Sequence, residues 1–189
     1  GMAFAYIAMT TISAWAPTYL ARTFEMSHGE IATRYGTIVL IFGLAGGMAA
    51  PAISALLGRF TGYPTMQTVR LAPVLLVIFA SMFAFAHTEG MALACLAGLT
   101  FSYTFPMSMG STSLQLATPA RLRGLAAAYY FITTSLVGYG IGPSAVPLLT
   151  KYALHDESRI GEAMAIVVVC FGSASFVLFT IAATRFRRQ

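Results

Sequence analysis

The chain has 189 residues, of which 58% are hydrophobic and 9% charged, with a mean hydropathy of +0.77 and a formal net charge of +5. Soluble domains carry about 25% charged residues, so this composition excludes a soluble protein and indicates an integral membrane protein in contact with the lipid bilayer. The basic residues stand singly at the ends of apolar segments, which excludes a nucleic-acid-binding surface.

Six apolar segments are each long enough to cross a bilayer, which takes roughly 20 residues. We predict an all-α integral membrane fold with transmembrane helices over about residues 2–20, 31–57, 69–86, 91–117, 124–150 and 163–184. Gly1 leads directly into the first apolar segment, with no basic region before it. We therefore expect either a piece of a longer protein or a tag remnant, Gly1-Met2, before a true start.

The spans differ in their polar content. In the first, Tyr6, Thr10 and Ser13 recur at i, i+4 and i+7 and share one helix face. Ser27 and Glu30 predict a capping box at the start of the second span, which is rich in glycine and alanine and suited to close packing. The third span has little polar content, and the fourth carries a hydroxyl stripe at a spacing of four: Thr100, Thr104, Ser108 and Thr112.

The fifth span combines several features of a moving helix. Its hydroxyl-bearing side chains include Tyr130 and Thr134, and such groups at membrane depth tend to face a bundle interior or a water-filled path. Gly138 and Gly142 are four residues apart and form a strip on which another helix can pack. Pro143 removes a backbone donor and is expected to bend or end the helix. We predict packing and hinge roles for these last three residues.

The third and sixth spans are nearly bare of polar groups, so we expect them to face lipid while the other four enclose a water-filled passage. The alternative role for the polar groups is interhelical hydrogen bonding, worth about 0.6 kcal/mol each. The predicted substrate-cavity residues are Tyr6, Thr10, Tyr103, Thr104, Ser108, Tyr130 and Thr134. Cys95 and Cys170 lie in apolar runs and are expected to be buried, and no metal-ligand cluster is apparent.

Basic residues in the loops predict the orientation. The side that carries both termini has seven, and the other side has four. The positive-inside rule therefore predicts a multi-pass protein of the plasma (inner) membrane with both termini in the cytoplasm. The two sets are Arg59, Arg70, Arg121, Arg123, Arg185, Arg187 and Arg188 on the terminal side, and Arg22, Arg34, Lys151 and Arg159 on the other.

Six spans with outer third and sixth helices resemble one half of a major facilitator superfamily transporter, the C-terminal six-helix half. Arg123-Gly124 through Gly138-Tyr139-Gly140-Ile141-Gly142-Pro143 is similar to the family's eleventh helix. The run Trp15-Ala16-Pro17-Thr18-Tyr19-Leu20-Ala21-Arg22, with Met26-Ser27 and Glu30-Ile31, is similar to the end of the seventh helix in Spinster-like members. The loop after the second span departs from the family pattern, because Gly46 to Arg59 holds no acid.

The resemblance implies a secondary transporter that works by alternating access between two six-helix bundles. The other bundle would be an N-terminal half of the same protein or a second copy of this chain. A small organic or amphipathic solute suits the hydroxyl and aromatic groups, and Spinster-like relatives imply a lipid-like substrate. The expected energy source is a proton or sodium gradient, with no bound cofactor. Because no acid lies at depth here, a coupling carboxylate is expected in the other half.

Two other classes of membrane protein can have six spans, an intramembrane protease and a scaffold protein. An intramembrane serine protease needs a histidine facing a serine at depth, and a zinc protease needs an H-E-x-x-H helix. The sequence has neither, so we predict that the protein is not an enzyme. The remaining alternative is a half-size or scaffold membrane protein that functions only as a self-associated bundle.

Overall fold

The computed structural model describes residues 1–59, 64–155 and 159–186, apart from the side chains of 64–66, 105–106, 111–113, 116–117, 183 and 185–186. Two residues named above, Arg187 and Arg188, therefore lie outside the described residues. The side chains of Thr112 and Arg185 are likewise not described. The described helices are α1 (Met2–Thr23), α2 (His28–Leu57), α3 (Pro64–Ala84), α4 (Glu89–Ala117), α5 (Arg123–Leu149) and α6 (Ile160–Phe186). A 3-10 turn, η1 (Ala120–Leu122), precedes α5, and a π-helical turn, η2 (Thr150–Leu154), follows it.

These elements confirm the predicted all-α fold class with six helices in the predicted order. Five of them, α2 to α6, are long and apolar enough to cross a membrane. The first, α1, has 22 residues but is interrupted by polar side chains such as Thr10, Thr11 and Ser13. Several of these hydroxyls are buried against other helices, so α1 depends on its neighbours to satisfy them.

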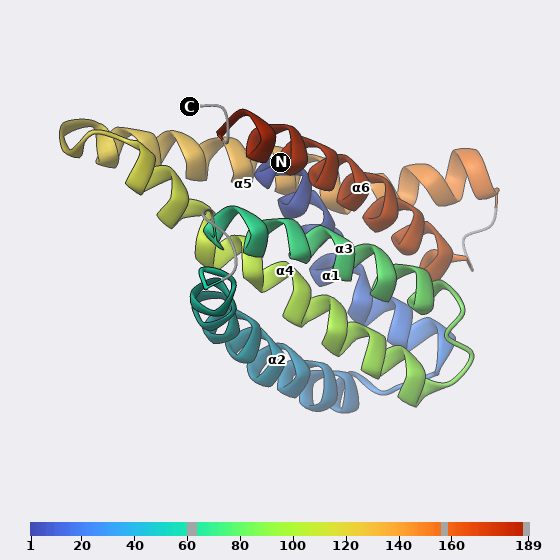
Figure 1. Ribbon diagram of the computed structural model, residues 1–189. Coiled ribbons are helices and arrows are strands. Elements are labelled where there is room, and N and C mark those ends of the chain that lie inside the picture. The colour runs from blue at the N-terminus through green and yellow to red at the C-terminus, as the bar shows by residue number, and fades with distance from the viewer. Residues whose placement is uncertain (60–63, 156–158, 187–189) are drawn as a thin grey trace.

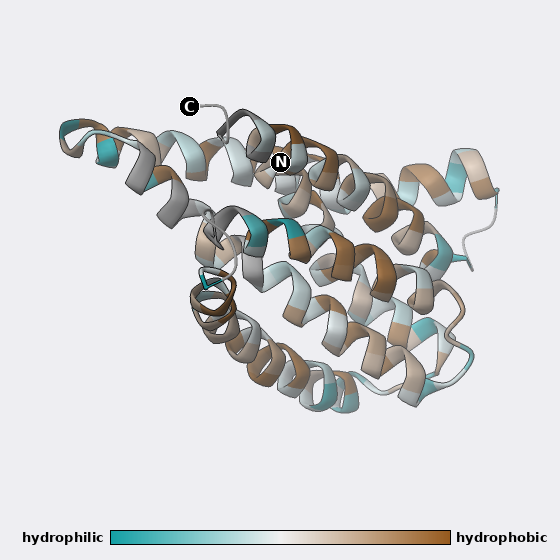
Figure 2. Ribbon diagram, in the orientation of Figure 1, coloured by the Kyte–Doolittle hydropathy of each residue, from teal (hydrophilic) through white to brown (hydrophobic). Residues whose placement is uncertain are grey.

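Figure 1 shows α6, α3, α4 and α2 following one another from the top of the view to the bottom, with α1 and α5 behind them. We call the end at which α1 begins and α6 ends the terminal end, and the opposite end the distal end. The main core lies where α1, α3, α4 and α6 meet, around large buried side chains. They include Ile7, Ile12, Leu76, Phe83, Leu96 and Met164. Hydrophilic segments gather at the helix ends and loops (Figure 2).

The exposed surfaces of α3 and α6 are apolar, but both helices are more deeply buried than α2 and α5, so it stays a prediction that they are the lipid-facing pair. Their exposed side chains include Val74, Ile78, Met82, Val177 and Ile181. Cys95 is buried as predicted, but Cys170 on α6 is exposed, so that prediction was wrong for Cys170. The reason is that lipid is as apolar as the protein interior, so an apolar run does not tell which of its faces is covered.

The flanking helices α2 and α5 are the least buried of the five apolar helices, which the sequence pattern did not indicate. Each buries a narrow face mainly on one neighbour, α4 for α2 and α1 for α5. The remaining surface of both helices carries large exposed side chains: Leu40, Ile41, Leu44 and Met48 on α2, and Leu125, Ile132, Leu136 and Tyr139 on α5. Lipid or a further apolar bundle must cover these faces.

The start of α2 has the predicted capping box. The Glu30 N–H donates to Ser27 Oγ at 3.3 Å, and the Ser27 N–H donates to the Glu30 carboxylate at 3.0 Å. An ion pair between Arg34 and Glu89 then joins the distal ends of α2 and α4. Both interactions fix the distal end of α2, which forms part of the site described below.

Helix α5 meets α1 through two glycines. A Cβ added at Gly138 would lie 2.4 Å from a ring carbon of Tyr6, and one at Gly142 would lie 2.1 Å from Thr10 Oγ1. The close approach lets α1 donate hydrogen bonds to α5 carbonyls, from Thr10 Oγ1 to Gly138 O at 2.7 Å and from Thr11 Oγ1 to Gly142 O at 3.1 Å. The lack of a side chain at these two positions of α5 is thus what brings the two backbones into hydrogen-bonding range.

Helix α5 does not end at Pro143, which was one of the two outcomes expected there, but runs on through Pro143 and Pro147 to Leu149. Pro147 has no N–H to offer the carbonyl four residues earlier, which belongs to Pro143. Trp15 Nε1 on α1 donates to that carbonyl at 2.9 Å instead. The helix therefore continues because α1 supplies the donor that the proline lacks, and whether Pro143 acts as a hinge stays a prediction.

The opposite flank has a matching contact. A Cβ added at Gly46 of α2 would lie 2.0 Å from Thr104 Oγ1 and 2.5 Å from Phe101 O of α4, and one at Gly47 would lie 3.4 Å from Ser108 Oγ. A threonine on a central helix thus meets a glycine on a flanking helix on both sides of the bundle. These two contacts set the positions of α2 and α5.

Replacement of Trp15 by phenylalanine should destabilise the protein by about 1 kcal/mol, because the Pro143 carbonyl loses its donor. In a Pro147→Ala background the cost of Trp15→Phe should fall by roughly half or more, since the alanine introduced there would supply a helical N–H to the same carbonyl. The free energy of unfolding of the wild type, the two single variants and the double variant is measured in mixed detergent micelles. As a control, Trp15→Phe is combined with Pro51→Ala, a proline in α2, and the effects of these two changes should add. Equal costs in both backgrounds would contradict the proposed link.

The two glycines Gly142 and Gly140 provide a second test on one helix. Gly142→Ala should lower the free energy of unfolding by about 1–3 kcal/mol, because its methyl group would overlap Thr10. A Cβ at Gly140 meets no atom within 4 Å, so Gly140→Ala should be neutral or stabilising by up to about 1 kcal/mol through its higher helix propensity. Thermal unfolding in lipid nanodiscs compares the two, and similar shifts in both variants would argue against the contact.

Candidate functional site: a hydroxyl-lined stripe on α1

One face of α1 stays uncovered between the two flanks. Tyr6, Met9, Ser13 and Pro17 follow each other at spacings of three and four, and all are partly or fully exposed. The opposite face of α1 carries Ala8, Ile12, Ala16 and other core residues. We call Tyr6, Met9, Ser13 and Pro17 the open stripe of α1. A serine in the middle of a membrane helix with its side chain uncovered indicates contact with water or with a polar solute.

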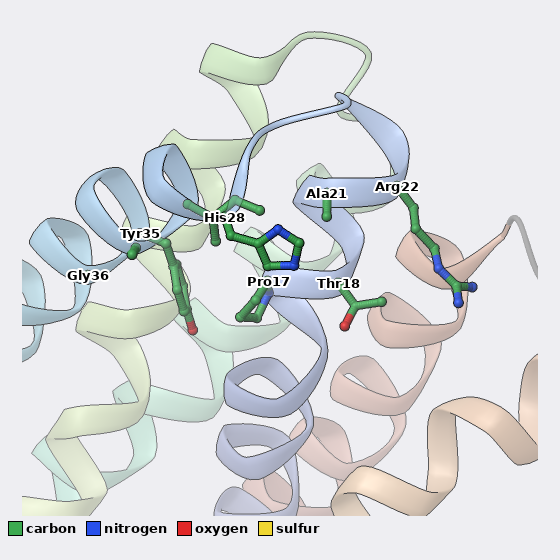
Figure 3. Close-up of a pocket in the computed structure, with 9 residues that line it drawn as sticks. Pro17, Thr18, Ala21, Arg22, His28, Tyr35 and Gly36 are labelled. Carbon is green, nitrogen blue, oxygen red and sulfur yellow. The ribbon is translucent and has the colours of Figure 1, made fainter.

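The open stripe ends in a cavity at the distal end, with a volume of about 540 Å³ (Figure 3). Its volume lies within the range of small-molecule sites, about 300–1,000 Å³. In Figure 3 the His28 imidazole lies over Pro17, Tyr35 reaches down from α2, and Arg22 extends to the other side of α1. The lining residues are Pro17, Thr18, Ala21, Arg22, His28, Ile31, Ala32, Tyr35 and Gly36.

Three helices bring hydroxyl groups together below this cavity. The Ser13 hydroxyl on α1 lies close to the phenol hydroxyls of both Tyr35 on α2 and Tyr103 on α4. Thr100 is fully buried near Tyr103, and its Oγ1 completes no hydrogen bond of normal geometry within the described part of the chain. We call Ser13, Tyr35, Tyr103 and Thr100 the distal cluster. It offers both donors and acceptors beside an apolar wall, which suits an amphipathic molecule.

A second group of tyrosines lies on the same stripe nearer the terminal end. The Tyr6 ring meets that of Tyr139 edge to face, with centroids 6.1 Å apart, and Tyr6 also lies close to Tyr130. Gly110 of α4 faces this group, since a Cβ there would lie 3.0 Å from the Tyr130 hydroxyl. We call Tyr6, Tyr130 and Tyr139 the terminal cluster. The α1 stripe thus carries aromatic hydroxyl groups at two different depths.

The predicted cavity residues divide into two sets in the structure. Tyr103 belongs to the distal cluster, and Tyr6 and Tyr130 to the terminal cluster. The others donate to helix backbones: Thr10 to Gly138 O, Thr104 to Phe101 O at 2.8 Å, Ser108 to Thr104 O at 3.1 Å and Thr134 to Tyr130 O at 2.7 Å. Contact of any of these seven residues with a substrate stays a prediction.

Sequence reasoning missed three members of the distal cluster as site residues. Thr100 belongs to the hydroxyl stripe of the fourth span, and that stripe could have included it. Ser13 shares the helical spacing of Tyr6 and Thr10, and that spacing could have included it. Tyr35 has no such signal, because it lies in the mixed polar start of α2, beside Arg34, and no regular spacing sets it apart. Only the packing of α2 beside α1 and α4 shows that Tyr35 faces Ser13 and Tyr103.

The charged groups of the described residues lie at the helix ends. Arg22 lines both the 540 Å³ cavity and a smaller hollow of about 190 Å³ between α1, α5 and α6, in which Lys151 also takes part. The described carboxylates of Glu30, Glu89 and Glu162 lie in first helical turns and Glu25 in a loop. No group of side chains suited to hold a metal ion occurs among the described residues.

Comparison with known proteins gives one informative match. The chain is 27% identical over 196 residues to an MFS-type efflux pump of Mycolicibacterium smegmatis (strain ATCC 700084 / mc(2)155), and the alignment covers 100% of this chain and 44% of the pump. The chain therefore spans less than half the length of the curated relative it matches. No family model and no solved structure matches the chain. The similarity supports a membrane transporter related to the major facilitator superfamily.

The open stripe predicts water access at Ser13. In a background where Cys170 and any other exposed cysteine are replaced by serine, Ser13→Cys should react with a membrane-impermeant methanethiosulfonate reagent, because thiolate forms only where water reaches. Val177→Cys, on the exposed apolar face of α6, is the matched control and should stay unmodified in lipid. Modification is counted by mass spectrometry on protein in membranes. A reactive Val177→Cys together with an inert Ser13→Cys would contradict this interpretation.

Proposed function

We propose that the chain is the C-terminal six-helix half of a secondary transporter of the major facilitator superfamily. It moves a small organic or amphipathic solute across the membrane by alternating access. The observation that carries this proposal is the open stripe of α1, with hydroxyl clusters at two depths between flanking helices. A solute held between two bundles can contact the distal cluster in one state and the terminal cluster in the other.

The chemistry of the stripe suggests the class of solute. Tyrosine rings provide apolar surface and their hydroxyls provide hydrogen bonds, and no described carboxylate lies among them. A neutral amphipathic molecule fits such a surface better than a strong cation would. Because the relative is an efflux pump, we propose export as the direction, with a lipid-like solute, as in Spinster-like proteins, as the narrower alternative. A transporter of this kind performs no covalent chemistry, so the protein is not an enzyme.

The second bundle of the proposed transporter is inferred from the apolar faces that this bundle leaves exposed. A second six-helix bundle, either an N-terminal half or another copy of this chain, covers the apolar faces of α2 and α5. A proton or sodium gradient drives transport, and the coupling carboxylate belongs to that second bundle, because the carboxylates described here are at helix ends. Both termini lie in the cytoplasm, and the host membrane is the plasma (inner) membrane. A scaffold protein would have no need for an uncovered hydroxyl stripe, so the half-size scaffold is not favoured.

Transport by the natural gene product that contains this chain tests the proposal. Expressed in bacteria that lack their main efflux pumps, it should lower the accumulation of the neutral amphipathic dye Nile red. An uncoupler that collapses the proton gradient, or removal of sodium, should restore accumulation. Unchanged accumulation across a panel of neutral amphipathic dyes, with the protein present in the membrane, would refute the proposed function.

Substitutions in the distal cluster sharpen this test. Tyr35→Phe and Tyr103→Phe should each slow efflux about three- to fivefold, since each removes one hydroxyl from the solute surface. Tyr129→Phe is the matched control, because Tyr129 is 74% exposed on the outer face of α5 and belongs to neither cluster. Initial efflux rates in everted vesicles, normalised to protein amount, are the measurement. An equal effect of all three changes would remove the cluster from the pathway.

A further inference from the structure

A separate groove lies between α3 and α6 at the distal end, beyond the passage described above. It has a volume of about 610 Å³, and its inner wall consists of Ala84, Phe85, Ala165, Ile166 and Val169. Ser81 also lines it, but its hydroxyl donates to Val77 O at 2.8 Å and is therefore satisfied within its own helix. The interior of the groove is thus apolar in character and opens on the surface that faces lipid.

The groove lies on the distal side of a close contact between α3 and α6. At mid-depth the two helices approach closely, since a Cβ added at Gly172 would lie 3.2 Å from Val77 Cγ2. Phe79 does not fill the space, because its ring packs over Gly98 of α4. From Glu162 at the rim to Cys170 at the inner end, eight residues of helix span about 12 Å, close to the hydrocarbon depth of one leaflet, about 15 Å.

The rim carries charges of both signs. Arg159 and Glu162 form a two-point ion pair, in which Nε donates to Oε1 at 2.9 Å and a terminal guanidinium nitrogen contacts Oε2. Both side chains remain nearly half exposed, at 45% and 42%, so a headgroup at the membrane surface can reach both of them. His87, in the loop after α3, also lines the groove.

We propose that this groove binds one zwitterionic phospholipid of the surrounding leaflet. One acyl chain lies between α3 and α6 and ends near Cys170. The phosphate meets the Arg159 guanidinium, and the headgroup ammonium meets the Glu162 carboxylate. The match in charge decides between headgroups. Among the described residues, the paired Arg159 and Glu162 offer a charge of each sign to a zwitterion, whereas an anionic headgroup would meet the Glu162 carboxylate unfavourably.

The proposal is independent of transport, since neither the stripe of α1 nor its clusters take part. A phospholipid held at this place contacts both outer helices, because residues of α3 and α6 line the groove. An apolar chain in an apolar groove gains little over bulk lipid, because lipid tails are as apolar as the groove. The selectivity is therefore expected in the headgroup, and the experiment has to compare headgroups with identical chains.

Photoreactive phospholipids with a diazirine near the end of one acyl chain test this directly. The natural gene product is reconstituted with equal fractions of phosphatidylethanolamine or phosphatidylglycerol probes, irradiated and digested. The ethanolamine probe should label peptides with Phe85, Ile166 and Val169 about fivefold more than the glycerol probe does, as expected when a charged hydrogen-bond partner is gained. Equal labelling by both probes, or labelling spread evenly over the Ile78 and Val177 surfaces, would identify ordinary boundary lipid and overturn the proposal.

Two sets of variants separate headgroup from chain. Arg159→Gln combined with Glu162→Gln should bring the labelling ratio of the two probes to about one. Ser81→Phe should reduce labelling by both probes because it fills the groove, while Ile78→Phe, an exposed position on the same helix that does not line the groove, should leave labelling unchanged. If Ser81→Phe fails to fold, the double variant Arg159→Gln with Glu162→Gln decides alone. A ratio of ethanolamine-probe to glycerol-probe labelling that stays near its original value in this variant would overturn the proposal.

Discussion

The bundle depends on how backbone carbonyls are satisfied where water is absent. Pro147 deprives the Pro143 carbonyl of its helical donor, and in hydrocarbon such a loss would cost several kcal/mol if nothing replaced it. Trp15 of α1 supplies the replacement, and Thr10 and Thr11 add donors to the neighbouring carbonyls of α5. The glycines Gly138 and Gly142 make these bonds geometrically accessible. The prolines, the glycines and the side-chain donors therefore form one interface between α1 and α5. The glycines allow the close approach, and the donors satisfy the carbonyls that the proline leaves without a partner.

This contact has a counterpart on the other flank, and together they shape the protein. Thr10 meets Gly142 between α1 and α5, while Thr104 meets Gly46 between α4 and α2. Helices held by such narrow strips leave most of their circumference uncovered, which explains the exposed apolar faces of α2 and α5. The same arrangement keeps the flanks apart, so that the stripe of Tyr6, Met9, Ser13 and Pro17 remains open.

The protein consequently has two different surfaces, a hydroxyl-lined one on α1 and an apolar groove between α3 and α6. On the α1 side, hydroxyl groups from α1, α2, α4 and α5 gather at two depths, and this surface suits a solute that changes sides. On the α3–α6 side, an apolar groove with a paired charge at its rim suits a resident phospholipid. Transport along the first surface, as proposed, needs helices that can move apart. The phospholipid proposed for the second surface would instead add contact between α3 and α6.

The sequence by itself determined the membrane class, the number and order of the helices, the capping box of α2 and the apolar outer surfaces of α3 and α6. These features depend on composition and local spacing, which act within one segment. Only the tertiary structure decided that Thr10 and Thr104 face glycines, that Ser13 and Tyr35 meet Tyr103, and that Cys170 is uncovered. In a bilayer both the interior and the surroundings are apolar, so hydrophobic pattern cannot orient a helix. Glycine contacts and single hydrogen bonds between distant segments orient it instead.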